Sequence, residues 1–381
     1  MRWEWKICTN GNMKYYIIAG EASGDLHGSN LIKGLKACDP EAEIRFWGGD
    51  LMAAACGESP VRHYADTAVM GFTDVLAKAG RLLGNISFCK RDILAWKPDV
   101  VILIDYPGFN FKIARFAHGK GFKVYYYIAP KTWASREGRN RKLKKYVDKL
   151  YIVFPFEIPY FKKAGVDFIY KGNPLLDAVD SHRYSPASHT PYVALLPGSR
   201  KGEIKRMMPV CMQVADKLGC KVVIAGAPSR SASDYAPFIG SRSNVELIFG
   251  RTYDILKYAQ AAIVNSGTAS LEAALIGTPQ VVCWSTTPLT AFLARHVLRV
   301  MDHIRFISLG NLILDKEAFK ELIQEDFTAD NVAAEVRAIS VPGDRRTQML
   351  ADYAAIRSAL GGSGASLAIA DSVCSSLREE H

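Results

Sequence analysis

The sequence predicts an α/β protein made of two doubly wound, Rossmann-like domains, each with a parallel sheet covered by helices on both faces. Its 381 residues are too many for one ordinary hydrophobic core and suit two domains of about 150–200 residues. Short apolar runs alternate with helix-length segments, which is the pattern of parallel sheets. One polar stretch with two prolines, residues 180–191, interrupts the alternation and is typical of an interdomain linker.

Five short apolar runs in the first half are expected to be strands. The most apolar of them, Val-Val-Ile-Leu-Ile at residues 100–104, is typical of a strand buried on both faces. Segments with 3.6-residue spacing lie between the runs and predict covering helices. The expected strands are residues 14–19, 43–47, 100–105, 122–128 and 149–153, and the expected helices include residues 29–37 and 82–96. These elements define a first domain at residues 13–180.

The second half repeats this architecture at residues 190–345. Its expected strands are residues 192–196, 220–225, 245–249, 261–264 and 280–284, and its expected helices are residues 202–218, 253–258 and 268–276. Two such domains joined by a linker are expected to enclose a cleft between the carboxyl ends of their sheets. Ligands of doubly wound sheets bind outside those strand ends, so the loops that follow strands should carry the chemistry.

Composition excludes several classes of protein. A content of 49% hydrophobic and 23% charged residues is typical of a globular chain and not of a disordered tail. No apolar run approaches the ~18 residues that a membrane span requires. The eight cysteines form no C-x-x-C pair and no zinc-type cluster with histidine, which predicts free thiols in a reducing compartment. We therefore expect a cytoplasmic protein.

The formal charge of +10 is concentrated in one segment. Residues 131–149 hold eight basic and two acidic residues and so carry a net +6. Such a run is typical of a solvated helix face, of a contact with an anionic membrane surface or a phosphate, or of RNA binding. No known RNA-binding pattern accompanies it.

The first candidate loop is Gly20-Glu21-Ala22-Ser23-Gly24-Asp25. It follows a predicted strand and leads into a helix, whose N-terminus attracts anions. The carboxylates of Glu21 and Asp25 would oppose a pyrophosphate, so the loop favours a site for sugar hydroxyls or for an acceptor, with Glu21, Ser23, Gly24 and Asp25 as contacts. The alternative is a structural turn in which Ser23 or Asp25 caps the helix.

Asp105 is the candidate catalytic residue. It ends the most apolar strand of the first half, and a carboxylate at that point faces the expected cleft in partly desolvated surroundings, as a general base requires. The alternative is an aspartate that caps the helix beginning near Phe109.

Two loops of the second half are suited to a nucleotide diphosphate. Leu195-Leu196-Pro197-Gly198-Ser199-Arg200 places small residues and a fixed cation before a helix but lacks the Walker spacing, which disfavours NTP hydrolysis. In the later loop, Ser266, Gly267 and Thr268 offer small donors at another helix N-terminus. Glu272 lies one helical turn further on the same face, where it could accept both hydroxyls of a ribose.

Residues 69–83 mix Phe, Val, Leu and basic side chains at helical spacing. This segment is predicted either to pack in the core or to form an interfacial helix that receives acyl chains.

A set of motifs in this order resembles the lipid-A-disaccharide synthase family. The match extends from about residue 14 to about residue 326. The motifs are residues 20–25 (GEASGD), 69–71 (VMG), 97–99 (KPD), 104–107 (IDYP), 155–157 (PFE), 195–200 (LLPGSR), 266–269 (SGTA), 271–272 (LE) and 309–312 (LGNL).

The resemblance implies a GT-B fold in which C-terminal helices, at about residues 350–381, cross back to the first domain. It implies an inverting transfer of 2,3-diacylglucosamine from UDP-2,3-diacylglucosamine to 2,3-diacylglucosamine 1-phosphate (lipid X), giving the β-1,6 disaccharide and UDP with no metal or cofactor. Asp105 matches the essential acid of the family, Arg200 matches the UDP-binding arginine, and Glu272 and Asn311 match further UDP contacts. Gly108 stands where many relatives carry a second aspartate.

The resemblance implies the two lipid substrates as partners, and it allows a homodimer in which Asn311 acts across swapped subunits. With such phosphorylated, acylated substrates, the basic run at residues 131–149 favours peripheral docking on the anionic cytoplasmic face of the inner membrane, and nucleic acid is not expected as a partner. Two alternatives stay open: a UDP-sugar 2-epimerase of the same architecture, and a non-catalytic basic protein that binds lipid or RNA.

Overall fold

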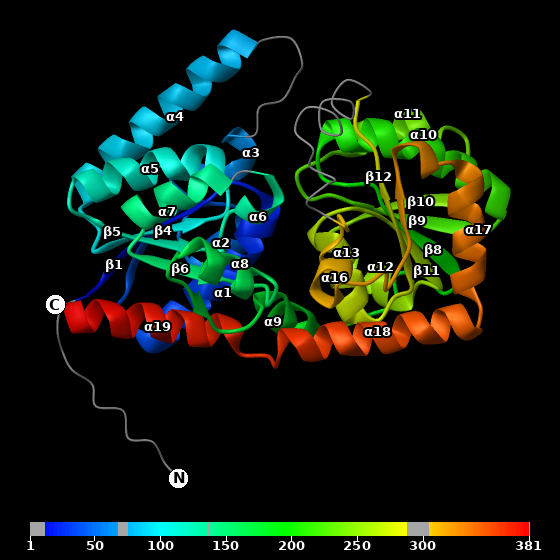
Figure 1. Ribbon diagram of the computed structural model, residues 1–381. Helices are drawn as coiled ribbons and strands as arrows, with labels where there is room; N and C mark the ends of the chain where they lie inside the picture. Colours follow the sequence, from blue (N-terminus) through cyan, green and yellow to red (C-terminus); the bar gives the residue numbers. More distant parts are fainter. Residues whose placement is uncertain (1–11, 68–74, 136, 288–304, 381) are drawn as a thin grey trace.

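A computed structural model describes residues 12–67, 75–135, 137–287 and 305–380, and it contains two parallel sheets side by side (Figure 1). Within these ranges the first sheet has seven strands in the order β3-β2-β1-β4-β5-β6-β7. The strands are β1 (Lys14–Ala19), β2 (Glu43–Gly48), β3 (Arg62–His63), β4 (Val100–Ile104), β5 (Lys123–Tyr127), β6 (Lys149–Ile152) and β7 (Ile169–Tyr170). The first domain is therefore doubly wound about β1 and β4.

The second sheet has six strands within the described ranges, in the order β10-β9-β8-β11-β12-β13. The strands are β8 (Tyr192–Leu196), β9 (Lys221–Gly226), β10 (Val245–Phe249), β11 (Ala261–Asn265), β12 (Gln280–Trp284) and β13 (Glu321–Ile323). All recorded pairings in both sheets are parallel. The expectation of two Rossmann-like parallel sheets is confirmed.

Helices cover both faces of each sheet. Those of the first domain are α1 (Ala22–Cys38), α2 (Asp50–Cys56), α3 (Tyr64–Thr67), α4 (Val75–Trp96), α5 (Pro107–Gly119), α6 (Thr132–Ser135), α7 (Asn140–Tyr146), α8 (Glu157–Ala164) and α9 (Pro174–Ser181). Those that follow are α10 (Lys201–Leu218), α11 (Ala236–Ile239), α12 (Thr252–Tyr258), α13 (Thr268–Ile276), α16 (Leu309–Leu314), α17 (Ala329–Ser340), α18 (Asp344–Leu360) and α19 (Ala365–Glu380).

Strand β1 shows why the sheets are sandwiched. Successive side chains of a strand point to opposite faces. Tyr15 and Ile17 pack in one buried cluster with residues of α1 and α19, whereas Tyr16 and Ile18 pack in another with residues of α4 and α5. All four are buried, so both faces of the strand need helical cover.

The two C-terminal helices connect the domains along one side of the molecule (Figure 1). Helix α18 packs on α13, α16 and α17 of the second domain, and α19 packs on α1 and α9 of the first. The chain therefore crosses between domains at residues 361–364, and α18 stays with the second domain although part of it was expected on the first. Asp177 of α9 fixes the crossing by accepting hydrogen bonds from the backbone N–H groups of Gly364 and Ser366.

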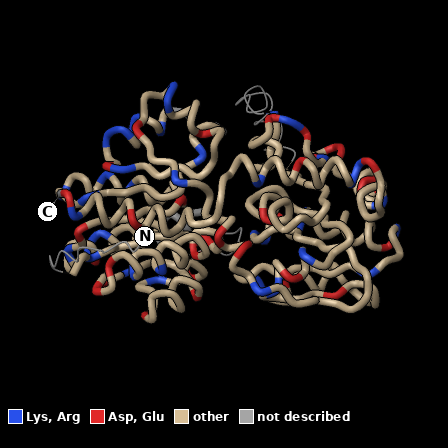
Figure 2. Tube along the Cα trace, turned by 90° about the horizontal axis from the view of Figure 1, so that it is seen from below, with Lys and Arg blue, Asp and Glu red and all other residues tan. Residues whose placement is uncertain are grey.

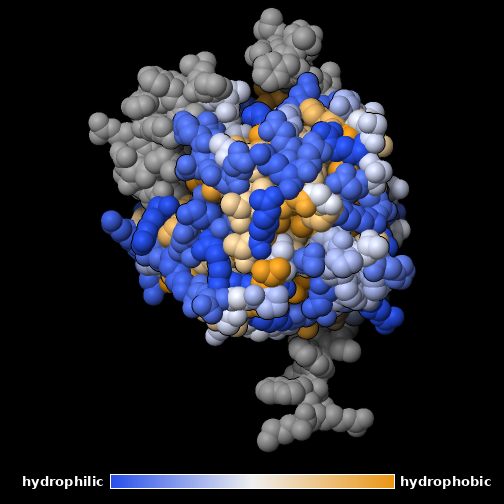
Figure 3. Space-filling model, turned by 90° about the vertical axis from the view of Figure 1, so that its right-hand side faces the viewer, coloured by the Kyte–Doolittle hydropathy of each residue, from blue (hydrophilic) through white to orange (hydrophobic). Residues whose placement is uncertain are grey.

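The face of the second domain that points away from the first is mostly hydrophilic, with a small apolar area near its middle (Figure 3). Among the residues that the structure describes, no helix is both long and apolar enough to cross a bilayer.

Candidate active site

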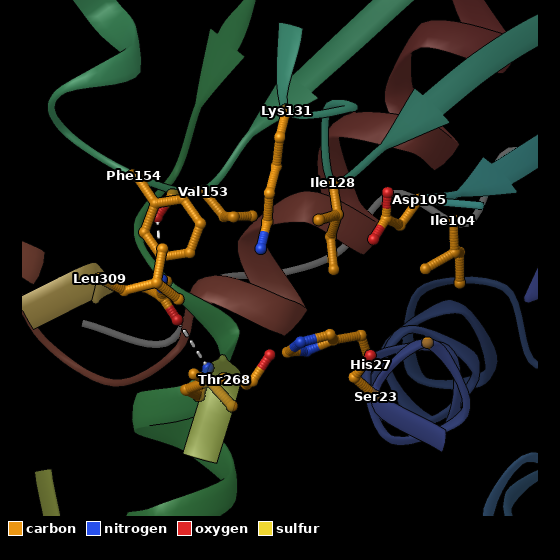
Figure 4. Close-up of a pocket in the computed structure, with 13 residues that line it drawn as sticks. Ser23, His27, Ile104, Asp105, Ile128, Lys131, Val153, Phe154, Thr268 and Leu309 are labelled. Atoms are coloured by element: carbon orange, nitrogen blue, oxygen red, sulfur yellow. Dashed lines mark hydrogen bonds between the residues drawn. The ribbon is translucent and has the colours of Figure 1, made fainter. Parts of the chain in front are cut away.

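A pocket lies between the two domains, at the carboxyl ends of their strands (Figure 4). Its cavity volume is about 50 Å³. The first domain supplies most of its wall, and the second supplies the first residues of two helices. The lining residues are Ser23, Gly24, His27, Ile104, Asp105, Ile128, Lys131, Val153, Phe154, Asn173 and Leu175 from the first domain and Thr268 and Leu309 from the second.

Asp105 enters this pocket from a strained turn directly after β4. Its φ is 41° and that of Tyr106 is 47°, a left-handed conformation that costs a non-glycine residue of the order of 1–3 kcal/mol. Two side chains hold the turn: the Tyr126 hydroxyl donates to the Asp105 carbonyl at 2.6 Å, and the Asn110 amide donates to the same oxygen at 2.8 Å. The turn leaves the Asp105 carboxylate directed into the cleft (Figure 4).

The surroundings of Asp105 tune its basicity in opposite directions. Burial raises the pKa of Asp105 above the ordinary aspartate value, and the Glu21 carboxylate raises it further. The Lys131 and Arg200 cations act against this shift. A carboxylate with a raised pKa takes a proton from a hydroxyl more readily than an exposed aspartate, and the two cations limit the rise of the Asp105 pKa.

Arg200 and Glu21 join the two domains at the rim of the cleft. The Arg200 guanidinium donates to both Glu21 carboxylate oxygens, at 2.8 and 3.0 Å, and to Glu203 Oε1 at 3.1 Å. Glu203 also accepts from the backbone N–H groups at the start of α10, at 3.0 and 3.1 Å, which fixes the loop that carries Arg200. Arg200 is thus held between two carboxylates, with one terminal nitrogen on Glu21 and the other on Glu203, and its guanidinium is a group that also suits a phosphate.

The loop before α13 is also positioned by the second domain. Thr268 lines the pocket, and the Ser266 hydroxyl donates to the Ile307 carbonyl at 3.2 Å. Glu272 accepts a hydrogen bond from the Tyr253 hydroxyl at 2.9 Å, and burial raises the pKa of Glu272. Of the candidate site residues, Ser23, Gly24, Asp105 and Thr268 line one pocket.

Asp25 requires a correction. The sequence places it in a substrate-binding loop, but α1 begins at Ala22, so Asp25 lies inside the helix and is only 2% exposed. Its carboxylate accepts hydrogen bonds from the backbone N–H groups of Gly49, Leu51 and Met52, at 2.7, 3.1 and 3.1 Å. It holds the N-terminus of α2 and does not face the pocket.

Asn311 also lies away from the pocket surface. It is fully buried, its Nδ2 donates to the Phe319 carbonyl and to Glu321 Oε1, both at 2.9 Å, and its Oδ1 accepts from the N–H groups of Ala318 and Phe319. In this structure its amide joins α16 to β13, and no part of the amide is left for the expected UDP contact.

Two titratable residues of the pocket were not singled out from the sequence as site residues. Lys131 belongs to the basic run, and Figure 4 shows its ammonium directed into the pocket. His27 lies one helical turn after Ser23, and this spacing of four was the available signal that both share a face of α1. His27 is 8% exposed and lines the pocket beside Asp105.

Two further expectations concern the segment at residues 69–83 and the binding of a metal ion. The segment at residues 69–83 falls partly outside the described residues, which omit 68–74; within α4, Leu83 is 59% exposed. In the described part of the chain, no group of three or more His, Cys, Asp or Glu side chains is arranged to hold a metal ion.

Solved structures of other proteins are similar to this architecture. A UDP-GlcNAc 2-epimerase from Neisseria meningitidis, bound to UDP-GlcNAc, matches 95% of this chain and 100% of its own with a TM-score of 0.67 and 13% identity. A calicheamicin glycosyltransferase matches with a TM-score of 0.57 and 14% identity, over 97% of this chain and 98% of its own. At such identities the likeness shows the fold alone. The chain is therefore a protein of the GT-B-type fold, which the matched epimerase and the matched glycosyltransferase share.

Sequence relatives identify the family within that class. The family model described as lipid-A-disaccharide synthetase matches residues 15–361. A lipid-A-disaccharide synthase from Geobacter metallireducens is 37% identical over 377 residues, covering 95% of this chain and 97% of the relative, and one from Syntrophus aciditrophicus is 38% identical over 365 residues, covering 92% and 94%. The chain belongs to the lipid-A-disaccharide synthase family and is a glycosyltransferase, so the expected resemblance is confirmed.

Proposed function

We propose that the chain transfers 2,3-diacylglucosamine from UDP-2,3-diacylglucosamine to the 6-hydroxyl of 2,3-diacylglucosamine 1-phosphate with inversion, forming the β-1,6 disaccharide 1-phosphate and UDP. The observation that carries the proposal is a carboxylate, Asp105, held by a strained turn in a pocket between two domains, with Lys131 beside it. The two lipid substrates are those implied by the family, and Asp105 is the general base that the pocket provides.

In this mechanism Asp105 accepts the proton of the acceptor 6-hydroxyl as its oxygen attacks the anomeric carbon of the donor. The bond from that carbon to the UDP oxygen breaks on the opposite face, and the electron pair leaves with the diphosphate. Arg200 and the N-terminal N–H groups of α13 stabilise the departing charge, as cations and helix dipoles do at such sites. Arg200 would exchange its present carboxylate partners for phosphate oxygens.

The small volume of the pocket bears on how the substrates enter it. Its 50 Å³ falls far below the ~300–1,000 Å³ typical of ligand sites. In the proposed reaction the two walls therefore move apart when substrates bind, and the Arg200–Glu21 bridge across the rim opens. The present cavity then corresponds to the reaction centre, and the nucleotide and the acyl chains lie outside it.

Substitution of the proposed base tests the reaction. Asp105→Asn is expected to fold normally and to lose turnover by about 10²–10⁴-fold, the usual contribution of general-base catalysis. Product is measured by mass spectrometry as the disaccharide 1-phosphate, with UDP release as a second readout. Asp167→Asn, at an exposed carboxylate of the same domain, is the control. Near-normal turnover of Asp105→Asn contradicts the assignment, and conversion of UDP-N-acetylglucosamine without acceptor would indicate an epimerase instead.

We also propose that the enzyme takes its lipid substrates at the anionic cytoplasmic face of the inner membrane, as a peripheral protein. Lys and Arg residues are numerous on the first domain (Figure 2). Helix α7 carries four exposed basic residues in five positions: Arg141, Lys142, Lys144 and Lys145. A cluster of this density attracts anionic lipid headgroups by about 1 kcal/mol for each basic residue near the surface.

A further inference from the structure

The reaction outlined above gives no role to His27, one of the polar side chains that line the pocket. His27 projects from α1 of the first domain toward Thr268 of the second, across the space beside Asp105 (Figure 4). Its ring is 92% buried, and its Nδ1 has no hydrogen-bond partner among the residues that the structure describes. Buried polar atoms of native proteins are nearly always paired, so an unpaired one that lines a pocket points to a ligand.

Other histidines of the first domain and the linker show the contrast. His63 accepts a hydrogen bond at Nδ1 from the Ala65 N–H, at 3.1 Å, and lies 3.6 Å from an Asp50 oxygen. His182 contacts Asp254 at 3.0 Å. Each of these rings has a protein partner, whereas Nδ1 of His27 has none within the described ranges.

The protonation state of His27 limits what it can bind. Burial lowers the pKa of His27 to about 4, so the ring is neutral at physiological pH. A neutral imidazole offers one N–H donor and one nitrogen acceptor, which matches a hydroxyl group, itself a donor and an acceptor. It offers no positive charge to a phosphate, for which Lys131 and Arg200 are better suited.

We propose that His27 is a specificity-determining residue of the transfer, and that its imidazole exchanges a hydrogen bond with a free hydroxyl of the donor sugar where that sugar lies between α1 and α13. This inference rests on the proposed function. The donor carries acyl groups at positions 2 and 3 and the nucleotide at position 1, so its free hydroxyls are those at positions 4 and 6. The side chain faces the second domain, which is why the donor sugar is the partner and not the acceptor, whose 6-hydroxyl is bound by Asp105.

Three variants of His27 distinguish a role in hydrogen bonding from a role in packing. His27→Leu keeps an apolar side chain of similar size and removes both nitrogens. His27→Asn retains a polar atom near the position of Nδ1, and His27→Gln retains one near the position of Nε2. We expect His27→Leu to lower kcat/KM for the natural donor by roughly 5- to 100-fold, the range for one lost hydrogen bond to a buried group. One of the two amide variants is expected to recover much of this loss.

Donor analogues then identify the partner. With the 4-deoxy or the 6-deoxy donor, whichever lacks the partner hydroxyl, the unmodified enzyme is expected to lose the same factor, and His27→Leu to lose nothing more. Binding gives a second readout: His27→Leu should weaken the binding of the UDP-sugar and leave the Kd of UDP itself unchanged, which a general defect of folding would not do.

The outcomes distinguish the two proposals. If the unmodified enzyme forms no disaccharide from authentic substrates, the proposed function fails. If it forms disaccharide while His27→Leu equals it, or while His27→Leu loses the same factor with the natural donor and with both deoxy donors, the role of His27 is overturned and the proposed function stands.

Discussion

Asp105 shows how one side chain depends on groups from a strand, a helix and two loops. Its backbone is held in a left-handed turn by Tyr126 and Asn110, and its charge is balanced between Glu21 and Lys131. The sequence predicts the position of Asp105, because a carboxylate after the most apolar strand must lie at the edge of the sheet. It does not predict the turn, because left-handed conformations of Asp and Tyr are set by tertiary hydrogen bonds.

Because Glu21 and Lys131 act in opposite directions on the pKa of Asp105, substitutions of these two residues are expected to shift the pH–rate profile in opposite directions. Asp105 works as a base when it is ionised, so kcat/KM rises with pH through its pKa, which lies above the ordinary value of 3.8. Lys131→Met removes a cation that lowers this pKa and is expected to move the acid limb to higher pH. Glu21→Gln removes an anion that raises the pKa and is expected to move the limb to lower pH.

The measurement is the apparent pKa of kcat/KM for each variant between pH 4 and pH 9. Lys163→Met, at an exposed position of α8, serves as the control and should leave the limb in place. A shift of the same sign in both pocket variants would contradict the electrostatic account of Asp105.

At the scale of elements, the sequence predicts the second domain more closely than the first. The expected bounds of β8, β10, α13 and β12 agree with the structure to the residue, because each is an apolar run ended by Gly, Pro or polar residues. Helix α1 begins seven residues before the expected start. The loop GEASGD looks like an extended turn because Gly and Ser are weak helix formers, yet packing against β1 and β4 makes it helical.

The contact between α1 and α19 depends on a glycine. A Cβ at Gly34 would lie 2.7 Å from the Ala370 Cβ and 3.2 Å from the Ser366 carbonyl oxygen, whereas one at Gly84 of α4 would meet nothing within 4 Å. Both lie inside helices. Gly34→Ala is expected to lower the free energy of unfolding by about 1–3 kcal/mol through overpacking, and Gly84→Ala to raise it by about 0.5–1 kcal/mol through helix propensity. Urea unfolding followed by tryptophan fluorescence measures both, and a stabilising Gly34→Ala would show that the helices part without cost.

The turn between β6 and α8 is expected to make stability depend on pH. Glu157 is 1% exposed and accepts from the N–H groups of Val153 and Phe154 and from Trp133 Nε1. Burial raises the pKa of Glu157 from its ordinary 4.5 to about 7, so the folded chain binds this proton more tightly than the unfolded chain. The contribution is present in full below pH 4.5 and is lost as the pH rises through 7.

The size of this loss is at most about 3 kcal/mol, from 1.36 kcal/mol for each unit of pKa difference. It is measured as the difference in unfolding free energy between the unmodified protein and Glu157→Gln, which cannot titrate, across pH 4.5–7.5. The unmodified protein should lose stability relative to the variant as the pH rises. A constant difference would show that Glu157 titrates near its ordinary value when folded.

At the scale of the whole molecule, the sequence predicts two domains, a cleft and the motifs at its edge. It does not reveal which motif residues face the cleft. Asp25 and Asn311 belong to the same motifs as Glu21 and Leu309, but buried hydrogen bonds direct their side chains into the protein. Such orientation depends on tertiary hydrogen bonds to residues outside the motif, and the residue pattern of a motif carries no signal for those.

The proposed attachment to membranes is tested at the basic surface of α7. The protein is expected to co-sediment with vesicles that contain anionic lipid at low salt and to be released at high salt, because surface charges are screened. Reversing Lys142 and Lys144 to Glu should weaken binding by more than tenfold, while Lys205→Glu with Lys257→Glu, at exposed positions of the second domain, should not. Equal effects of the two pairs would show that total charge matters and that α7 is no docking surface.

The packing of α19 on α1 affects the order in which the two domains can fold during synthesis. The first domain is the first to be synthesised, yet one face of its sheet is completed by residues 365–380, such as Ile369 and Val373, which the ribosome adds after the entire second domain. The second domain, which needs no residue beyond α18 for its own packing, can therefore close first, although domains of nascent chains generally fold in the order of synthesis. During that interval the apolar side of α1 is uncovered, and it is the surface on which a chaperone would be expected to act.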